Sequence, residues 1–417
     1  MRRIAIVGAG QAGLQLALGL RTLAPDDYEV LVVSARRPAE IRAGRVQSTQ
    51  QMFEPALALE RALGLGLWDA VAPRITGAEL VTADPPGTRA LTVTGTLRAP
   101  AQSVDLRLKT ARWLELFEER GGRVEYRSLT AGELPALAAA QDLTLVATGR
   151  GPLGELFGRD KRHSPYDGPR RTLAVVYLHG VAPQPRLPGH LRLIATPGAG
   201  ELFLIPGLTL SGPCDMLLWE AVPGGPLDRW HQLATPEAVL ARSLELMRHH
   251  APWEYERCAG AEPTDAGASL VGAVTPVVRH PVAEVAPGSH VLGLADAVVL
   301  NDPLAGQGCN TAAHCADHTL RRILDRGERP FDRAWQQQTF AGWWEERARH
   351  STAFTNLLLD GAPEHMRQTL RAAAGHPEIA HRYVNGFADP ADYREWLLEP
   401  ERAAAYLAAV TGRPPGP

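Results

Sequence analysis

The first 33 residues combine two apolar runs with a glycine-rich turn. Residues 4–7 are apolar, residues 8–13 read Gly-Ala-Gly-Gln-Ala-Gly, and leucines at helical spacing follow over residues 14–20. A second apolar run covers residues 30–33. Short continuous apolar runs are typical of buried parallel strands, so this order predicts a strand, a glycine turn, a helix and a second strand, which together form a βαβ unit.

Similar patterns recur further along the chain. A helix through residues 113–117 and a strand over 123–126 are predicted from their periodicity. Residues 142–149 indicate another buried strand. Residues 291–296 indicate a further one, which leads through a glycine-rich loop into a helix from about 311 to 326.

The middle of the chain, residues 170–285, has a different pattern. Its strand-like segments are short and are separated by Pro/Gly turns, which predicts an antiparallel sheet. These segments are residues 173–178, 191–195, 202–205 and 216–220.

Taken together, the patterns predict an α/β fold in three parts. A Rossmann-like dinucleotide-binding domain is expected over residues 1–165 and 286–330. It is interrupted by an inserted, mainly antiparallel-sheet substrate domain over residues 166–285. Residues 331–417 are expected to form a helical C-terminal segment.

Composition excludes several classes of protein. The 417 residues carry a net charge of −3, without the basic excess of a nucleic-acid-binding protein. The four cysteines are scattered and form no C-x-x-C pair, and no apolar run approaches the roughly 20 residues of a membrane helix. Lys109 and Lys161 are the only lysines and no Gly-Lys-Ser/Thr occurs, which excludes a P-loop. We therefore expect a cytoplasmic protein that binds no metal, nucleic acid or membrane.

The glycine turn predicts a phosphate-binding site. Gly8 permits a tight turn, Gly10 allows the backbone to approach a pyrophosphate, and Gly13 allows close contact between helix and strand. The second strand ends at Ser34, where an acidic residue usually binds the ribose, and Arg36 follows in a turn. The motif by itself therefore leaves FAD, NAD and NADP open.

A second cofactor contact is predicted at 293–311. Asp296 ends a buried strand, and Gly306-Gln307-Gly308 opens a helix ten residues later. An acid at such a position suits ribityl hydroxyls, and a helix N-terminus stabilises negative charge on a flavin ring. The alternative is an ordinary turn and helix of an α/β sheet, with Asp296 as a cap.

Together these features resemble the FAD-dependent aromatic hydroxylase class, and more closely the epoxidase components of styrene and indole monooxygenases. The resemblance covers nearly the whole chain. It is carried by residues 7–14, 44–49, 97–108, 119–122, 147–149, 200–206 and 302–308.

The motif and the resemblance imply an FAD site and a substrate cavity. The implied cofactor-binding residues are Gly8, Gly10, Gln11, Ala12, Gly13, Ser34, Arg45, Ser48, Thr148, Asp296, Pro303, Gly306, Gln307, Gly308 and Asn310. The implied substrate residues are Gln47, Ser48 and Leu304.

Two of these residues have alternative interpretations. Arg45 suits a flavin contact or a surface ion pair. Asn310 is the candidate catalytic group, as a neutral hydrogen-bonding side chain beside the reacting oxygen, or it is a helix cap. The implied chemistry needs no acid–base residue, because a flavin C4a-hydroperoxide transfers the oxygen.

The resemblance also implies partners. Residues 147–149 read Ala-Thr-Gly where single-component hydroxylases carry an Asp-Gly motif, and no second dinucleotide fingerprint occurs. We therefore expect reduced FAD to be supplied in trans by an NAD(P)H-dependent flavin reductase, with O₂ as co-substrate. A homodimer stays open.

The expected substrate is a small hydrophobic or aromatic alkene, indole or thioether. Residues 77–81 contain few rings, and Gln47 stands where the family has an apolar side chain, so the substrate is expected to be larger or more polar than styrene. The rival interpretations are an FAD-dependent dehydrogenase or saturase of the same fold and a non-enzymatic flavin-binding sensor.

Overall fold

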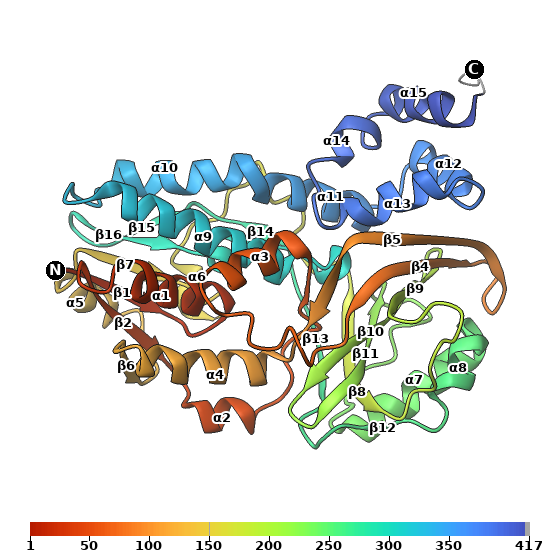
Figure 1. Ribbon diagram of the computed structural model, residues 1–417, viewed down its shortest axis with the longest axis horizontal. Coiled ribbons are helices and arrows are strands. Elements are labelled where there is room, and N and C mark those ends of the chain that lie inside the picture. The colour runs from red at the N-terminus through yellow and green to blue at the C-terminus, as the bar shows by residue number, and fades with distance from the viewer. Residues whose placement is uncertain (150, 413–417) are drawn as a thin grey trace.

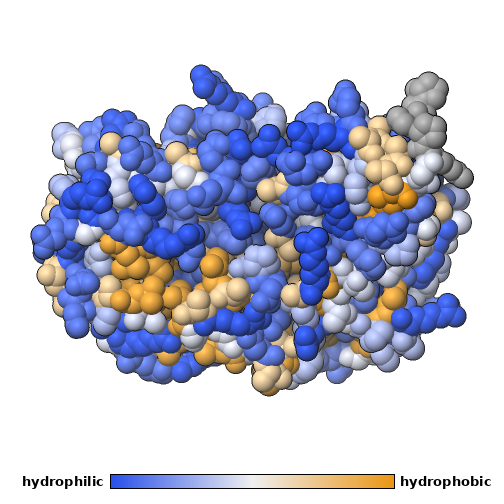
Figure 2. All heavy atoms as spheres, turned by 45° about the horizontal axis from the view of Figure 1, so that its top comes forward, coloured by the Kyte–Doolittle hydropathy of each residue, from blue (hydrophilic) through white to orange (hydrophobic). Residues whose placement is uncertain are grey.

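The computed structural model describes residues 1–149 and 151–412. Two large sheets lie side by side, each with its own helices, and the last helices of the chain lie on the side of the larger one (Figure 1). A third sheet pairs only β14 (Val277–Val278) with β17 (Val299–Leu300). The N-terminus is at the far end of the smaller sheet and the C-terminus is at the opposite end of the molecule (Figure 1). On the face shown in Figure 2, hydrophilic residues predominate and apolar residues form separate patches.

The smaller sheet has six strands and is mostly parallel. Its strands, in spatial order, are β15 (Val282–Ala286), β16 (Ser289–Gly293), β7 (Leu143–Val146), β1 (Arg2–Val7), β2 (Tyr28–Ser34) and β6 (Arg123–Tyr126). β1, β2, β6, β7 and β16 run parallel, and β15 pairs antiparallel with β16 at the edge. The predicted βαβ unit is confirmed, because α1 (Gln11–Leu23) connects β1 to β2.

Helices of the smaller sheet pack mainly through one large apolar core. In this core α1 contacts both α4 (Leu106–Glu119) and α9 (Gly308–Arg326), and α9 contacts α10 (Arg333–Trp343). Shorter helices complete this part of the molecule: α2 (Pro38–Arg42), α3 (Glu54–Ala62), α5 (Leu134–Ala139) and α6 (Pro152–Glu155).

The larger sheet has nine strands. Its main path is β12 (Glu262–Pro263), β8 (Thr172–His179), β11 (Gly212–Ala221), β10 (Gly200–Thr209), β9 (His190–Thr196), β4 (Ile75–Ala83), β5 (Arg89–Ser103) and β3 (Gln51–Met52), while β13 (Ser269–Ala273) pairs with β8. Most pairs are antiparallel, as predicted for the middle of the chain, but β4 and β9 are parallel. Helices α7 (Pro236–His250) and α8 (Pro252–Cys258) pack together near this sheet.

The division between the two sheets differs from the expected domain limits. Strands β4 and β5 fall within the expected 1–165 dinucleotide-binding part, yet they pair in the larger sheet. Strand β15 falls within the expected 166–285 substrate part, yet it pairs in the smaller sheet. Hydrophobic patterning identifies strands, but a strand's partners lie far away in sequence, so the pattern does not say which sheet a strand joins.

Successive residues of the larger sheet face two different cores. In β10, Leu202 and Leu204 belong to the core that includes α7, whereas Phe203 and Ile205 belong to a core on the opposite face. This is the period-two alternation of a strand that is covered on both sides. The second face looks toward the junction with the smaller sheet and the C-terminal helices, and it forms the wall of the cavity described below.

The remaining C-terminal helices follow α10. A π-helical turn (Trp344–Ala348) leads into α11 (Arg349–Leu359), α12 (Glu364–Ala373), α13 (Pro377–Gly386), α14 (Tyr393–Trp396) and α15 (Pro400–Thr411). The expected helical segment is therefore confirmed through residue 411. Within residues 1–149 and 151–412, no helix combines the length and apolarity that crossing a bilayer requires.

Candidate flavin site and apolar cavity

Four predicted residues lie at one edge of the smaller sheet. Ser34 ends β2, Gly8 follows β1, Thr148 follows β7, and Asp296 lies just beyond β16. These strands are neighbours in the sheet and run in the same direction, so their carboxyl ends meet at the same edge. In open α/β sheets, ligands bind at this edge.

The β1–α1 turn has the geometry of a phosphate-binding loop. Gly8 has φ +119°, which side-chain-bearing residues rarely adopt. A Cβ on Gly13 would lie 2.1 Å from the Gly8 carbonyl oxygen, so only glycine allows this close packing of helix and strand. A Cβ on Gly10 would meet no atom within 4 Å, which leaves the start of α1 open to a ligand. Gln11 and Ala12 begin the helix, where backbone N–H groups have no intrahelical partner.

Thr148 and Asp296 form the adjacent part of this edge. The Thr148 Oγ1 is buried and has no hydrogen-bond partner within the described residues. A Cβ on Gly149 would lie 2.3 Å from the Asp296 Cβ, so the two strand ends are closely packed. The Asp296 side chain itself is exposed. A buried hydroxyl without a partner beside an accessible carboxylate fits a ligand that carries hydroxyl groups.

Ser34 is placed at the edge but its hydroxyl is engaged. Its Oγ donates a hydrogen bond of 2.7 Å to the Arg36 carbonyl, and the residue is only 3% exposed. The hydroxyl therefore stabilises the turn after β2. Arg45 is exposed on the following loop.

The second predicted segment follows β17 and leads into α9. Pro303–Ala305 forms a short 3-10 helix, labelled η2, and its Leu304 N–H donates to Asp302 Oδ1 at 3.1 Å. Gly306 follows with φ +61°, and α9 begins at Gly308 rather than near residue 311. A Cβ on Gly308 would meet no atom within 4 Å, so this helix start is also open.

Gln307 fixes this segment to the C-terminal helices. Its side-chain amide donates to the Ala305 and Phe387 carbonyls, and its oxygen accepts from Ser351. The side chain is buried among these partners. Gln307 therefore holds the start of α9 against the C-terminal helices.

Asn310 is a clamp between two segments of the site. Its Oδ1 accepts from the Phe53 N–H at 2.8 Å, and its Nδ2 donates to the Gln51 and Gly306 carbonyls at 2.9 Å each. The residue is 5% exposed. These bonds hold residues 51–53 against the 303–306 segment. Both polar atoms of the side chain thus bond to backbone groups, and the role of Asn310 toward the reacting oxygen stays a prediction.

The 48–50 segment is held by Tyr177 of β8. The Tyr177 hydroxyl donates to the Ser48 carbonyl and accepts from Gln50 Nε2 at 2.7 Å. Burial raises the pKa of Tyr177 well above its usual range, so the hydroxyl keeps its proton and can donate it. Gln50 adopts φ +38°, a strained conformation that this network stabilises.

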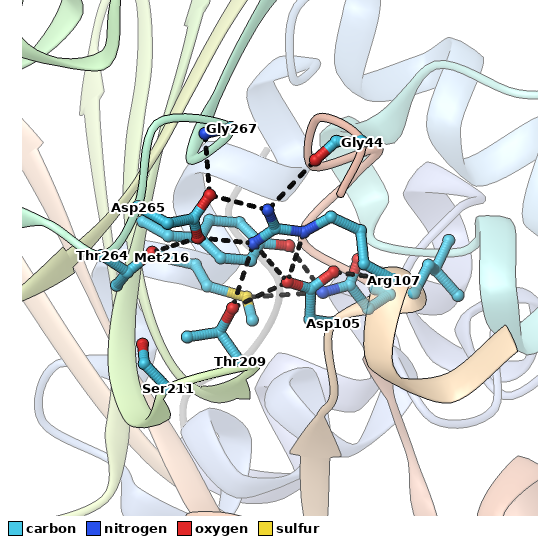
Figure 3. Close-up of polar contacts among 12 residues, drawn as sticks. Gly44, Asp105, Arg107, Thr209, Ser211, Met216, Thr264, Asp265 and Gly267 are labelled. Carbon is cyan, nitrogen blue, oxygen red and sulfur yellow. Dashed lines mark hydrogen bonds and ion pairs between the residues drawn. The ribbon is translucent and has the colours of Figure 1, made fainter. Parts of the chain in front are cut away.

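A cluster of one arginine and two aspartates holds the start of the loop that leads to residues 48–50 (Figure 3). Arg107 of α4 lies between Asp105 and Asp265, with hydrogen bonds of 2.8–2.9 Å to both carboxylates. Its guanidinium also donates to the Gly44 carbonyl at 3.2 Å. Val46 donates its N–H to the Gly267 carbonyl at 2.9 Å. The cluster therefore fixes residues 44–46, which lead into the 48–53 segment.

An apolar cavity with an empty volume of about 590 Å³, partly open to solvent, lies between these segments and the larger sheet. Leu304, Thr49 and Gln51 line this cavity, whereas Gln47 and Ser48 are not among its lining residues. The roles of Leu304, Gln47 and Ser48 toward a substrate stay predictions. The other lining residues come from the start of α3, the sheet, the 303–306 segment and the C-terminal end of α13: Phe53, Gly77, Ala78, Leu80, Leu97, Leu191, Leu193, Phe203, Ile205, Leu218, Pro303, Ala305, Gly306, Val384 and Phe387.

Most of these lining residues were not predicted from the sequence. Phe203 and Ile205 lie on alternate positions of one strand, and that alternation is the signal that could have placed them on a common face. Val384 and Phe387 have no such signal, because only the position of α13 brings them to the cavity. Among residues 1–149 and 151–412, no group of His, Cys, Asp and Glu is arranged to hold a metal ion.

The chain is similar to styrene monooxygenases over its whole length. Residues 149–257 match the family model described as "Styrene monooxygenase A putative substrate binding domain". Styrene monooxygenase StyA of Pseudomonas fluorescens is 30% identical over 415 residues, which cover 96% of each chain. A styrene monooxygenase StyA of another Pseudomonas is 30% identical over 422 residues, which cover 98% of each chain.

Solved structures share the fold at lower identity. The flavin-dependent halogenase CmlS superimposes with a TM-score of 0.63 and 16% identity, over 85% of this chain and 65% of that chain. The protein described as "pqsL, a probable FAD-dependent monooxygenase from Pseudomonas aeruginosa" gives a TM-score of 0.62 and 16% identity, over 90% of this chain and 99% of that chain. The predicted α/β fold is thus confirmed as that of FAD-dependent halogenases and monooxygenases.

Proposed function

Because the chain belongs to the styrene monooxygenase family and is a flavin-dependent monooxygenase, we propose that it is the oxygenase component of a two-component system. A separate NAD(P)H-dependent reductase would supply reduced FAD. The observation that carries this proposal is the position of the apolar cavity, which has the predicted flavin-binding segment 303–306 as one of its walls.

The residues of the site fit an FAD molecule that extends between the two predicted segments. The start of α1 would bind the pyrophosphate through backbone N–H groups, with Gly10 leaving the room for it. Thr148 and Asp296 would bind the ribityl chain, which supplies a partner for the buried Thr148 hydroxyl. The ring would lie against Pro303–Gly306, where the start of α9 at Gly308 is open. Bound reduced FAD would supply the oxygen-activating chemistry, which amino-acid side chains lack.

The protein's own contribution is to orient the substrate and to limit water. Among the described residues that line the cavity, none is charged, and Thr49 and Gln51 supply the few polar atoms. Such a lining favours a neutral, apolar substrate held by shape, with one or two hydrogen bonds to orient it. A small aromatic or hydrophobic alkene, indole or thioether meets this description. Exclusion of water would protect the reactive flavin from unproductive decay.

Supply of reduced flavin in trans is supported by the motifs present. The chain has one dinucleotide fingerprint, at residues 8–13, and Ala147-Thr148-Gly149 stands where single-component hydroxylases carry an Asp-Gly motif. The nicotinamide cofactor would therefore be used by the reductase, and this chain would exchange flavin with it.

The test is to provide electrons in two ways and to measure product. With NADH or NADPH alone, the purified chain should consume neither at a useful rate. With chemically reduced FAD and oxygen, it should convert styrene or indole to an oxygenated product, measured by chromatography. Rapid NAD(P)H oxidation by the chain alone would contradict the two-component proposal, and absence of product with reduced FAD would contradict the proposed reaction.

A further inference from the structure

A cluster of three carboxyl groups lies behind the wall of the cavity. Leu218 of β11 lines the cavity, and Glu220 is two positions further along the same strand, so it projects from the same face of the sheet. Its cross-strand partner in β10 is Glu201. Asp302 approaches this face from the segment that begins η2. Both Glu220 and Asp302 are 0% exposed.

Among the residues that the structure describes, Arg171 is the arginine paired within this cluster, and its partner is Glu201. Arg171 donates from Nε and Nη2 to the two Glu201 carboxylate oxygens at 2.8 Å and 2.9 Å. That two-bond geometry is the strongest arrangement an arginine–carboxylate pair adopts, and it neutralises Glu201. Within residues 1–149 and 151–412, no cationic side chain donates a hydrogen bond to Glu220 or Asp302, and both are closed to water. A buried carboxylate without a partner is strongly destabilised, so such a site favours a proton.

The hydrogen-bond inventory leads to the same conclusion. If both carboxyls were ionised, Glu220 Oε1, Glu220 Oε2 and Asp302 Oδ2 would all be buried acceptors with no donor. A proton on Glu220 closes a side-chain hydrogen bond to Asp302. Asp302 Oδ1 then remains free to accept from the Leu304 N–H.

We propose that Glu220 is a positioning residue that holds a proton and donates it in a hydrogen bond to Asp302, and that this acid–carboxylate pair fixes the Pro303–Gly306 wall of the cavity. The claim that this wall contacts flavin rests on the proposed function. The claim that Glu220 is protonated is independent of it, because burial and the neighbouring charges alone determine the protonation state.

The charged and titratable groups that face the pair agree with this assignment. Burial, and then the charge of Asp302 and Glu201, raise the pKa of Glu220 well above its usual range, against the opposing charge of Arg171. Burial raises the pKa of Asp302 to about 6, although the bonds from Leu304 and Glu220 lower it. Tyr166 also faces Asp302, but its hydroxyl donates to the Asn356 carbonyl and is not a donor to the pair.

The first experiment tests the proton without flavin. Glu220→Gln keeps the shape and an N–H donor but cannot ionise. A carboxyl group whose pKa is raised on folding stabilises the folded state at low pH, and this stabilisation is lost as the pH rises toward the folded-state pKa. The natural chain should therefore lose stability from pH 5 to pH 8, whereas the glutamine of the variant cannot titrate. The melting temperature of Glu220→Gln minus that of the natural chain should hence be about 2–4 °C larger at pH 8 than at pH 5. A difference in melting temperature that is independent of pH would overturn the proposal.

A matched control uses another buried glutamate near the same sheet. Glu254 is 0% exposed, but its carboxylate is paired with Arg192 and Arg257. Glu254→Gln breaks these ion pairs, so it should lower the melting temperature at both pH values, with no gain toward pH 8. If Glu220 only packs against its neighbours and holds no proton, the difference in melting temperature from the natural chain should not depend on pH in either variant.

The second experiment tests the effect on the wall. Glu220→Leu removes the donor and leaves Asp302 Oδ2 without a partner, so the affinity for reduced FAD, titrated anaerobically, should fall about tenfold or more. Glu220→Gln should stay within about threefold of the natural chain. Unchanged affinity in Glu220→Leu would show that the pair does not hold the wall. If the natural chain binds no reduced FAD while the pH-dependent gain of Glu220→Gln is seen, the proposed function fails and the protonated pair stands.

Discussion

Two buried groups of ionisable side chains support the site, and their buried charge is compensated in different ways. Around Arg107, one guanidinium is shared by Asp105 and Asp265 and holds the loop that starts at Gly44. Next to η2, no cation among the described residues pairs with Glu220 or Asp302, because Arg171 is bound to Glu201. The first group is stabilised by opposite charge and the second by a shared proton. Both fix a segment that contributes to the cavity or leads to it.

The two groups therefore respond oppositely to pH. Burial opposes ionisation of Asp265, but hydrogen bonds and charge from Arg107 outweigh it and lower the pKa of Asp265. Burial raises the pKa of Asp302 to about 6, because the hydrogen bonds from Leu304 and Glu220 and the charge of Arg171 offset it only in part. The first group thus keeps its carboxylates ionised beside a cation, whereas the second group keeps one proton, which Glu220 donates to Asp302.

The largest effect is expected from removing the cation of the first group. Arg107→Met leaves Asp105, which is 0% exposed, as an unpaired buried carboxylate. The free energy of unfolding should fall by about 3–5 kcal/mol. Arg112→Met is the matched control on the same helix, because Arg112 forms an exposed pair with Glu119 and should cost about 1 kcal/mol or less. Urea unfolding measures both, and similar losses in the two variants would contradict the role given to Arg107.

A smaller effect should separate the two groups by pH. The stabilisation from protonated Asp302 is present below its unfolded-state pKa of 3.8 and is lost as the pH rises through about 6. The free energy of unfolding of Asp302→Asn minus that of the natural chain should therefore be roughly 2 kcal/mol larger at about pH 7.5 than at about pH 4.5.

Asp265→Asn provides the opposite case. The lowered pKa of Asp265 gives stability that is present above the unfolded-state value of 3.8 and is lost only as the pH falls below it. The difference between this variant and the natural chain should hence stay constant from about pH 4.5 to pH 7.5. Parallel profiles for the Asp302 and Asp265 variants would remove the distinction between the two groups.

The smallest effect concerns the neutral clamp that joins the two segments. Asn310→Asp keeps the acceptor for the Phe53 N–H but replaces the donor to the Gln51 and Gly306 carbonyls with a second oxygen. Two lost hydrogen bonds should loosen the wall and weaken binding of reduced FAD by about tenfold.

Asn385→Asp is the control for this clamp. Asn385 of α13 bonds to backbone in the same way, accepting from Arg98 and donating to the Thr96 carbonyl, but away from the predicted flavin segments. Its replacement should leave reduced-FAD affinity within about twofold. An equal loss in both variants, measured by anaerobic titration, would mean that Asn310 has no specific role at the flavin wall.

The local part of the site was predictable from the sequence. The glycines of residues 8–13 and the segment 303–308 act through backbone geometry over a few residues, and short motifs encode such geometry directly. The family resemblance implied that Leu304 borders a substrate cavity, and Leu304 lines the apolar cavity of the structure. The functions of Asp296 and Thr148 in binding FAD stay predictions.

The parts that depend on distant contacts were not predictable. The role of Asn310 arises from residues 51–53, more than 250 positions away in sequence. Glu220 is a single charged residue in the otherwise apolar run of residues 216–222, which is a signal of a special environment, whereas Arg107 lies among other charged residues and carries no such signal. That signal does not reveal whether a cation or a proton satisfies the charge, because the answer depends on how Arg171 and Glu201 are paired.

The most direct test of the account is an anaerobic titration of the natural chain with reduced and with oxidised FAD. The reduced ring is largely anionic near neutral pH, and the open start of α9 at Gly308 would stabilise that charge by up to about 2 kcal/mol. Reduced FAD should therefore bind at least about tenfold more tightly than oxidised FAD. Gly308→Val, for which the protein itself leaves room, should narrow the ratio. Equal affinities for the two forms would contradict the account and would indicate a permanently flavin-bound dehydrogenase or sensor.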